Sequence, residues 1–319
     1  MGISYKAEQD TESRLVRILH PVVKKWFFHR FSSFSIPQRM SVLEIHSRRN
    51  VLVSAPTGAT KTLTGFLAIL NELVDSSEKG ILEDRIYCVY ISPLKALNYD
   101  IEHNLLGPLK EMEHVNGDDL GIRVAVRTGD TSPQEKSKML KKPPHILITT
   151  PESLAIMLSA PRFREKLQGV SWCIIDEVHA LADNKRGVHM SLSLERLERL
   201  SPGMCRIGLS ATVAPIDEVA GFLVGSKRDC TVIDVQYIKE LDLKVLSPVP
   251  DLINTDYELR HRKMYELIHE LCQEHKTTLV FTNTRAATER VVNFLKEQFP
   301  DRYKDNIGAH HDVLHDIRA

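Results

Sequence analysis

The sequence has no excess of charge of either sign. Its 319 residues include 42 Lys and Arg and 42 Asp and Glu, so the formal net charge is +0. A protein that coats nucleic acid by charge alone needs a strong positive balance. The composition therefore argues against such a protein, and any nucleic-acid site would have to be a local basic groove.

Closely spaced cysteines and long apolar runs are also missing. The cysteines are odd in number and form no CxxC motif, so we expect buried, reduced thiols rather than a disulfide framework or a zinc site. They are Cys88, Cys173, Cys205, Cys230 and Cys272. The longest apolar runs are too short to cross a membrane, and the N-terminal residues do not resemble a signal peptide. We therefore expect a cytoplasmic protein.

Short apolar runs alternate with amphipathic stretches along most of the chain. Several runs are apolar throughout, which is typical of strands in a parallel sheet that is covered on both faces. The runs are 50–56, 87–93, 123–129, 145–151, 171–178, 205–212 and 230–235. Helical periodicity separates them, as at Leu63, Phe66 and Leu70. The sequence predicts an α/β fold with a doubly wound parallel sheet.

A proline-rich segment divides the chain. Pro248 and Pro250 disfavour helix and strand interiors, so we predict a linker over 244–252. Beyond the linker, 276–284 has the composition of a strand and lies between two helical patterns. So few elements cannot close a second α/β core, and we expect 253–319 to be a truncated unit.

The stretch "APTGATKT", 55–62, follows a predicted strand and opens a predicted helix, as a phosphate-binding loop does. Backbone N–H groups at such a helix start face phosphates. Lys61 would contact the β and γ phosphates, and Thr62 would offer its hydroxyl to Mg²⁺. A chance strand–turn–helix corner remains the alternative for this stretch taken alone.

Two further strand ends carry polar groups. "DEVH" closes the run at 171–178, and an acidic pair at the end of an apolar strand is costly without a cation. Asp176 could hold Mg²⁺ and Glu177 could orient or deprotonate a water molecule, whereas a helix N-cap would explain only one carboxylate. "LSAT", 209–212, adds two hydroxyls, which an N-cap explains equally well when that stretch is taken alone.

In this order, "APTGATKT", "DEVH" and "SAT" resemble motifs I, II and III of the superfamily-two helicases. Further segments resemble motifs Ia, Ib and IV of that superfamily: "SPLKAL" (92–97), "TPESL" (150–154) and "LVFTNTR" (279–285). Two more are similar to the large helicase-related (Lhr) family of bacteria and archaea: "RTGDT" (127–131) and "DNKRGVHMSLSLERL" (183–197). The resemblance extends over nearly the whole chain.

The resemblance implies a RecA-like fold of the P-loop NTPase class and an ATP-dependent helicase with ATP and Mg²⁺ as cofactors. Lhr-type enzymes translocate 3′ to 5′ on single strands and unwind DNA or RNA:DNA duplexes, with repair or recombination as the implied role. DNA is the expected partner, with RNA as the alternative. The implied domains are an N-terminal helical segment (1–35), a complete first RecA-like domain (36–243) and a partial second RecA-like domain (253–319) without motifs V and VI.

The resemblance also assigns roles to matching positions. Asp176, Glu177 and Lys61 are the implied catalytic residues, with Thr62 and Asp176 at the Mg²⁺. The implied nucleotide-binding residues are Gln38, Ala55, Thr57, Gly58, Ala59, Thr60, Lys61 and Thr62. The residues implied to couple the two sites are His179, Ser210 and Thr212. The implied nucleic-acid contacts are Pro93, Lys95, Arg127, Thr128, Thr150, Glu152, Thr282 and Arg285.

One position departs from the family pattern. Thr60 stands where the loop normally has glycine, and a β-branched residue resists the backbone torsions that glycine allows. Strain of roughly 1–3 kcal/mol would weaken binding by roughly 5- to 150-fold. We therefore expect weakened ATP binding. The alternative reading is a truncated or degenerate relative that binds nucleic acid or a partner without ATP turnover.

Overall fold

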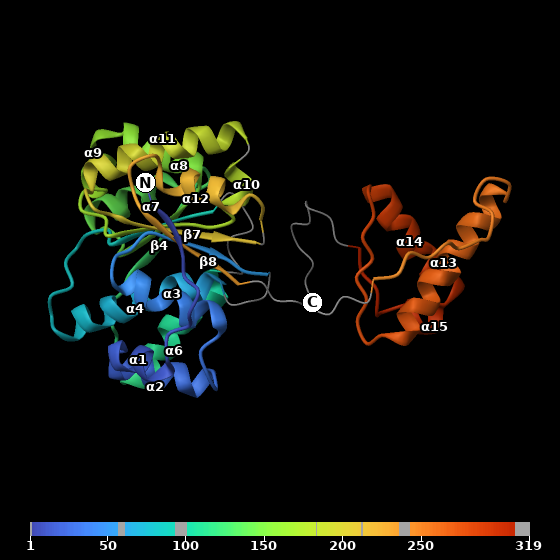
Figure 1. The fold of residues 1–319 in the computed structure, drawn as a ribbon, viewed down its shortest axis with the longest axis horizontal. Coiled ribbons are helices and arrows are strands. Elements are labelled where there is room, and N and C mark those ends of the chain that lie inside the picture. Colours follow the sequence, from blue (N-terminus) through green and yellow to red (C-terminus); the bar gives the residue numbers. More distant parts are fainter. Residues whose placement is uncertain are drawn as a thin grey trace. The chain divides into compact units, whose positions relative to one another are not determined.

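The computed structural model describes residues 2–56, 61–92, 101–182, 184–211, 213–235 and 243–309, apart from the side chains of Glu102 and His103. The chain divides into two compact units, Met1–Ile238 and Lys239–Ala319 (Figure 1). No helix in the described ranges is both long enough and apolar enough to cross a membrane.

A single parallel sheet of eight strands forms the centre of the first unit. The strand order is β1-β8-β2-β7-β6-β3-β5-β4, and every neighbouring pair is parallel. The strands are β1 (Ile3–Tyr5), β2 (Val51–Ser54), β3 (Cys88–Ile91), β4 (Val124–Arg127), β5 (Ile146–Thr149), β6 (Trp172–Ile175), β7 (Cys205–Ser210) and β8 (Cys230–Asp234). All seven strands predicted for this unit are confirmed. The eighth, β1, was missed because three partly exposed residues at a sheet edge show no apolar pattern.

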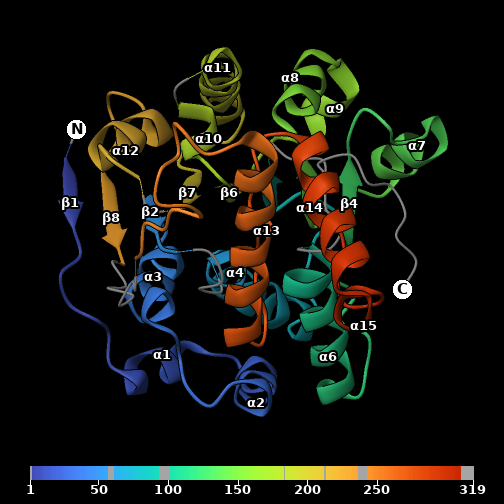
Figure 2. The ribbon, with the colours of Figure 1, turned by 90° about the vertical axis from the view of Figure 1, so that its right-hand side faces the viewer.

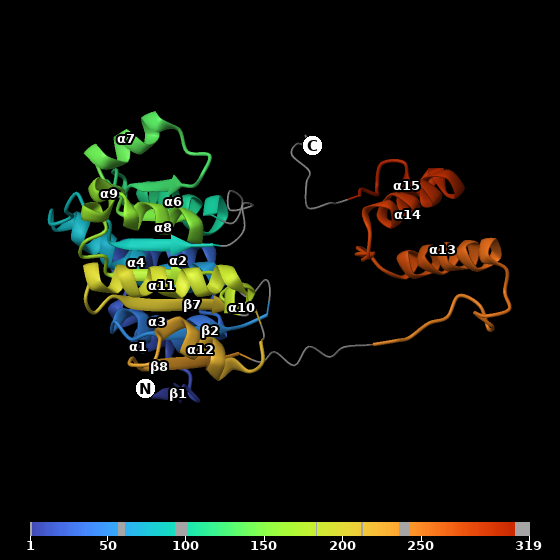
Figure 3. The ribbon, with the colours of Figure 1, turned by 90° about the horizontal axis from the view of Figure 1, so that it is seen from above.

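Helices cover both faces of this sheet, which confirms the predicted doubly wound α/β fold (Figures 1 and 3). One face carries α1 (Glu12–Ile18), α2 (Pro21–Arg30), α3 (Ile36–His46), α4 (Lys61–Glu78), the π-helical η1 (Glu102–Leu106) and α6 (Gly107–Asn116). The other carries α7 (Pro133–Lys141), α8 (Pro151–Ser159), α9 (Pro161–Lys166), α10 (His179–Ala182), α11 (Lys185–Leu200) and α12 (Ile216–Val224). Each face has its own apolar core, because the side chains of each strand alternate between the two faces.

The cysteines are free thiols, as predicted from their spacing. Four of them are buried in strands of the sheet: Cys88, Cys173, Cys205 and Cys230. Burial raises the pKa of Cys173, Cys205 and Cys230 to about 12, because a thiolate loses hydration in an apolar core. The buried thiols are therefore held in the unreactive protonated form.

A buried histidine precedes β5. The backbone N–H of Arg123 donates to Nδ1 of His145 at 3.1 Å, so the ring proton resides on Nε2, which is buried without a hydrogen-bond partner among the described residues. Burial, with the nearby Arg123 charge as a smaller cause, lowers the pKa of His145 to about 4. The ring is therefore neutral in the folded chain under conditions in which it is protonated in the unfolded chain.

We expect His145 to destabilise the protein in acid. The pKa of His145 is lowered on folding, so the unfolded chain binds a proton at a higher pH than the folded chain does. The folded state therefore has its full free energy of unfolding above the unfolded pKa near 6.5, and this free energy falls as the pH drops from there towards about 4. The expected loss is about 2–3 kcal/mol. Urea denaturation of His145→Gln between neutral pH and pH 4.5 should show a flatter profile than the parent chain. The exposed His46→Gln is the control, and equal slopes for both variants would contradict this assignment.

The second unit consists of helices α13 (Tyr257–Glu274), α14 (Arg285–Gln298) and α15 (Pro300–Tyr303). They pack around a small buried cluster that includes Tyr265, Val291 and Leu295. Two helices were predicted here and are confirmed as α13 and α14. Residues 243–256, which include the expected linker over 244–252, contain neither helix nor strand.

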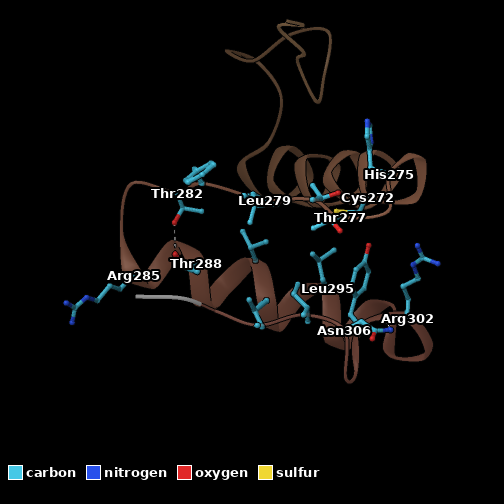
Figure 4. Close-up of a pocket in the computed structure, with 18 of the residues that line it drawn as sticks. Cys272, His275, Thr277, Leu279, Thr282, Arg285, Thr288, Leu295, Arg302 and Asn306 are labelled. Atoms are coloured by element: carbon cyan, nitrogen blue, oxygen red, sulfur yellow. Dashed lines mark hydrogen bonds between the residues drawn. The ribbon is translucent and has the colours of Figure 1, made fainter. Parts of the chain in front are cut away.

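The predicted strand at 276–284 is wrong. Those residues form no strand, and 243–309 contains no other strand that could pair with them. An apolar sequence becomes a strand only when a neighbour satisfies its backbone N–H and C=O groups. Leu279 is 79% exposed and Phe281 is 90% exposed, beside a hollow of about 1100 Å³ between this segment, α14 and α15 (Figure 4).

Candidate nucleotide and nucleic-acid site

The polar groups at the ends of β2, β6 and β7 meet at one edge of the sheet. These strands are parallel, β7 pairs with both β2 and β6, and Ser54 is opposite Ser210. Ala55 follows β2, Asp176 follows β6, and Ser210 ends β7. Parallel α/β sheets bind ligands beyond the carboxyl ends of their strands. The fold therefore brings these predicted residues together.

Lys61 is the first residue of α4 and is only 8% exposed. Its Nζ is buried and has no hydrogen-bond partner among the described residues. A buried ammonium group without a partner is costly, so this position is suited to an anion that arrives with a ligand. The neighbouring helix start also favours negative charge.

Asp176 lies within electrostatic range of Lys61 and is 9% exposed. Its Oδ1 accepts a hydrogen bond from the backbone N–H of Glu177 at 2.9 Å, and its Oδ2 accepts one from the hydroxyl of Tyr90. Burial raises the pKa of Asp176, and the Tyr90 hydrogen bond opposes that rise. Tyr90, which stacks on Phe66, is a site residue that the sequence analysis missed. Its sequence signal was a tyrosine within an otherwise apolar central strand, because a buried phenol hydroxyl needs a hydrogen-bond partner.

Glu177 and His179 form a chain of contacts that ends on β7. The backbone N–H of Ala211 donates to Nδ1 of His179 at 3.3 Å, so the ring proton resides on Nε2 and faces the Glu177 carboxylate at 3.2 Å. The same Nδ1 lies 3.1 Å from Oγ of Ser210. Glu177 has φ +47, a strained conformation for a residue other than glycine and one found at functional sites. The strand end of β7 is thus linked to the acidic pair.

The described residues fit a magnesium ion only in part. In these ranges no three His, Cys, Asp or Glu side chains gather to hold a metal. Mg²⁺ bound with a nucleotide takes most of its ligands from phosphates and water, and needs one carboxylate or hydroxyl from the protein. Asp176 and the partly buried Thr62 supply such groups. Of the predicted residues, Thr57, Gly58, Ala59, Thr60 and Thr212 lie outside the described ranges.

Gln38 takes part in a local structure. It stands at the third position of α3, where its Oε1 accepts a hydrogen bond from the backbone N–H of Ser35 at 2.9 Å. This capping box fixes the start of the helix. The side chain is 2% exposed, so the structure gives Gln38 a folding role whether or not it also reads an adenine.

The predicted nucleic-acid contacts in the first unit follow β4 and β5. Arg127 ends β4, with its Nε buried and unpartnered among the described residues and its guanidinium 5.2 Å from the ring of Phe163. The backbone N–H of Thr128 donates to Thr131, and Thr150 caps α8 by accepting from the N–H of Ser153 at 3.3 Å. Helix N-termini and hydroxyls of this kind contact phosphates. Pro93 and Lys95 lie outside the described ranges.

Glu152 pairs with a residue that the sequence analysis did not single out. Its Oε1 lies 2.8 Å from Nε of Arg186, which belongs to α11. Partial burial raises the pKa of Glu152, but hydrogen bonds from Arg186 and the helix lower it by more. The side chain of Asn184 caps α11 by accepting from the backbone N–H groups of Arg186 and Gly187. The start of α11, within the Lhr-like stretch, is therefore connected to α8 by the pair of Arg186 with Glu152.

Thr282 and Arg285 belong to the second unit. Oγ1 of Thr282 lies 2.7 Å from Oγ1 of Thr288, and Arg285 begins α14; all three are among the residues that line the hollow (Figure 4). Both lie at one end of the segment 276–284, and Thr284 caps α14 between them.

Comparison with known proteins shows the family of the chain. The model of the DEAD/DEAH box helicase family matches residues 35–219. The ATP-dependent helicase Lhr-Core of Methanothermobacter thermautotrophicus is 55% identical over 95% of this chain, and the Lhr helicase/uracil glycosylase of Escherichia coli is 36% identical over 96%. The chain spans 36% and 21% of those two proteins, respectively.

Solved structures give the same result. The structure of Mycobacterium smegmatis helicase Lhr bound to ssDNA and AMP-PNP is 40% identical, with a TM-score of 0.74 over 89% of this chain and 36% of that one. The DEAD-box helicase Mss116 bound to ssRNA and UDP-BeF is 19% identical with a TM-score of 0.70 over 94% of this chain and 61% of that one, and shares the fold. The family model covers more than half of the sequence, and the chain belongs to the DEAD/DEAH box helicase family.

Proposed function

We propose that this chain is the nucleotide-binding part of an Lhr-type helicase, acting in the cytoplasm. The similarity to Lhr-Core proteins over nearly the whole chain supports the type. Unwinding and 3′ to 5′ translocation on DNA or RNA:DNA duplexes are proposed for the longer protein, because the chain spans little more than a third of those relatives.

The observation that carries the proposal is the buried, unpartnered ammonium group of Lys61 beside Asp176. Lys61 would bind the β and γ phosphates of ATP, and Thr62 and Asp176 would hold Mg²⁺, which neutralises charge on the phosphates. Glu177 would orient and deprotonate the attacking water. His179 donates to Glu177 and contacts Ser210, so it would transmit the state of the nucleotide site to β7.

The nucleic-acid strand would be held at the carboxyl ends of β3, β4 and β5. Thr128 and Thr150 would position phosphates there through hydroxyls and backbone N–H groups, as sequence-independent binding requires. A single strand is the proposed substrate, with DNA preferred and RNA as the alternative; the relatives bound to ssDNA and to ssRNA support both. Residues 36–243 are proposed as the first RecA-like domain and 253–319 as part of the second.

Titration with a fluorescent ATP analogue in the presence of Mg²⁺ tests this function. We expect saturable binding by the chain and much weaker binding by Asp176→Ala, because the variant lacks the carboxylate that faces the cation. Absence of binding at millimolar nucleotide, in chain shown to be folded, would refute the proposal and favour a relative that binds nucleic acid without ATP turnover.

We expect Thr60→Gly to bind ATP more tightly than the parent chain. Glycine adopts the torsions of a phosphate-binding loop without strain, and relief of roughly 1–3 kcal/mol corresponds to roughly 5- to 150-fold in affinity. The same nucleotide titration measures the gain. Thr64→Gly, a change of the same kind within α4, is the control and should not tighten binding. Equal affinities of Thr60→Gly and the parent chain for ATP would contradict the hypothesis that Thr60 weakens nucleotide binding.

A further inference from the structure

A cationic face lies on two neighbouring helices of the first unit. Helix α7 connects the edge strand β4 to β5, and α9 packs beside it (Figures 2 and 3). Met139 of α7 and Phe163 of α9 are buried in the same apolar cluster. Met139 is the only fully buried residue of α7, and Leu140 beside it is partly buried against the same cluster, so most of the other side chains of this helix are exposed. We call the solvent-facing side chains of 133–142 and 161–166 the α7/α9 face.

This face has a large local charge on a chain without net charge. Helix α7 and its C-cap carry Lys136, Lys138, Lys141 and Lys142. Helix α9 carries Arg162, Arg164 and Lys166. The acidic residues of the two stretches are Glu135 and Glu165, which leaves a local charge of +5. A local basic surface of this kind is what the neutral composition requires of any nucleic-acid site.

The cations of the face form no close ion pairs among the described residues, although Lys138 lies within electrostatic range of Glu135. Among the described residues, none of its seven cations has a carboxylate within ion-pairing distance, whereas Arg39, Arg123 and Arg228 elsewhere in the unit are ion-paired. Glu135 accepts hydrogen bonds from both Oγ and the backbone N–H of Ser132, and these bonds lower its pKa. That carboxylate is therefore engaged in capping α7.

The spacing of the lysines places like charges together. Lys138, Lys141 and Lys142 stand at i, i+3 and i+4 and are all exposed. Lys138 and Lys141 stand in the last turn of α7 and Lys142 is its C-cap, a position where the helix dipole favours positive charge, so the cluster is held on the surface at little cost in folding stability. Such a surface is stabilised when a polyanion binds and its counterions are released.

We propose that the α7/α9 face binds the phosphate backbone of double-stranded nucleic acid. No large apolar or aromatic side chain is exposed on either helix, so the face lacks the stacking platform that single-strand binding uses. A duplex presents a denser row of phosphates than a single strand. Helix α7 begins just after Thr131 and runs back from the carboxyl edge of the sheet, because it joins the parallel strands β4 and β5, so a duplex held at its lysines would make a contact separate from the proposed strand site. This inference rests on the proposed function and extends it to a second contact.

Anisotropy titrations of the whole chain with a blunt DNA duplex and with a short single strand, over a range of salt concentrations, test the proposal. The variant is Lys138→Gln/Lys141→Gln/Lys142→Gln. The control is Lys24→Gln/Lys25→Gln/Lys227→Gln, which removes the same charge from exposed lysines outside the face. For the duplex, we expect the variant to reduce the slope of log K against log salt by about 2.7, at about 0.9 for each lost contact. The control and the single strand should show little change.

The outcomes separate this inference from the proposed function. Equal loss of duplex binding in variant and control would overturn the inference, because charge alone would then explain it. Binding of the single strand without binding of the duplex would overturn the inference and leave the proposed function intact. Failure of the parent chain to bind either nucleic acid would overturn both. A variant that loses binding only to phosphatidylserine vesicles would assign the face to a membrane instead.

Discussion

Lys61→Met is expected to stabilise the nucleotide-free chain and to remove most of its affinity for ATP. The Lys61 ammonium group is buried and has no hydrogen-bond partner among the described residues, and the Asp176 carboxylate within electrostatic range offsets only part of the cost of burying it. Methionine has a similar volume and no charge, and it should raise the free energy of unfolding by about 1–2 kcal/mol. Losing the cation that faces the phosphates should weaken binding by about 2–5 kcal/mol, or roughly 30- to 5000-fold.

Urea denaturation with and without ATP and Mg²⁺ measures both effects in one experiment. Without nucleotide, Lys61→Met should unfold at higher urea than the parent chain. With saturating nucleotide the order should reverse, because a ligand stabilises only the protein that binds it. Lys227→Met, at an exposed lysine, is the matched control and should change neither quantity. A loss of stability in Lys61→Met without nucleotide would show that the ammonium group has a partner in the folded chain.

Gly187→Ala is expected to destabilise the first unit severely. Sequence propensity predicts the opposite, because alanine favours a helix interior by about 1 kcal/mol over glycine. A Cβ at Gly187, however, would lie 1.7 Å from the backbone oxygen of Leu181 and 2.7 Å from its carbonyl carbon. Backbone atoms cannot rotate away as a side chain does, so α10 and α11 must separate. We expect a loss of about 3 kcal/mol in the free energy of unfolding, the upper end for overpacking.

The damage should also reach the functional site. Helix α10 begins at His179, and Arg186 precedes Gly187, so displacement of α11 should break the pair of Arg186 with Glu152. Gly129→Ala is the control, since a Cβ there meets nothing within 4 Å, and its stability should stay within about 0.5 kcal/mol of the parent. An unchanged or increased stability of Gly187→Ala would mean that α10 and α11 are not packed as described.

The amino-acid sequence was sufficient to predict the central sheet and the edge of the sheet at which the candidate site is proposed. Strands buried on both faces are continuous apolar runs, so the seven predicted strands are visible in local composition. The polar residues that break those runs, such as Asp176 and Ser210, stand at strand ends for the same reason. Parallel strands bring their carboxyl ends to one edge of the sheet. Because the motifs stand at those strand ends, their positions in the sequence were enough to predict that the proposed nucleotide-site residues lie close together.

Tertiary structure alone decided the order of the strands and the partners of the site residues. The hydrogen bond of Tyr90 to Asp176 joins residues on neighbouring strands, and the pair of Glu152 with Arg186 joins two helices. Neither contact leaves a pattern in the local sequence, because each contact depends on which elements pack together in the fold. The segment 276–284 shows the converse: its composition favours a strand, but a strand also needs a neighbour, and the described part of the second unit provides none. The local sequence sets the propensity of a segment for helix or strand, and long-range hydrogen bonds and packing decide which structure it adopts.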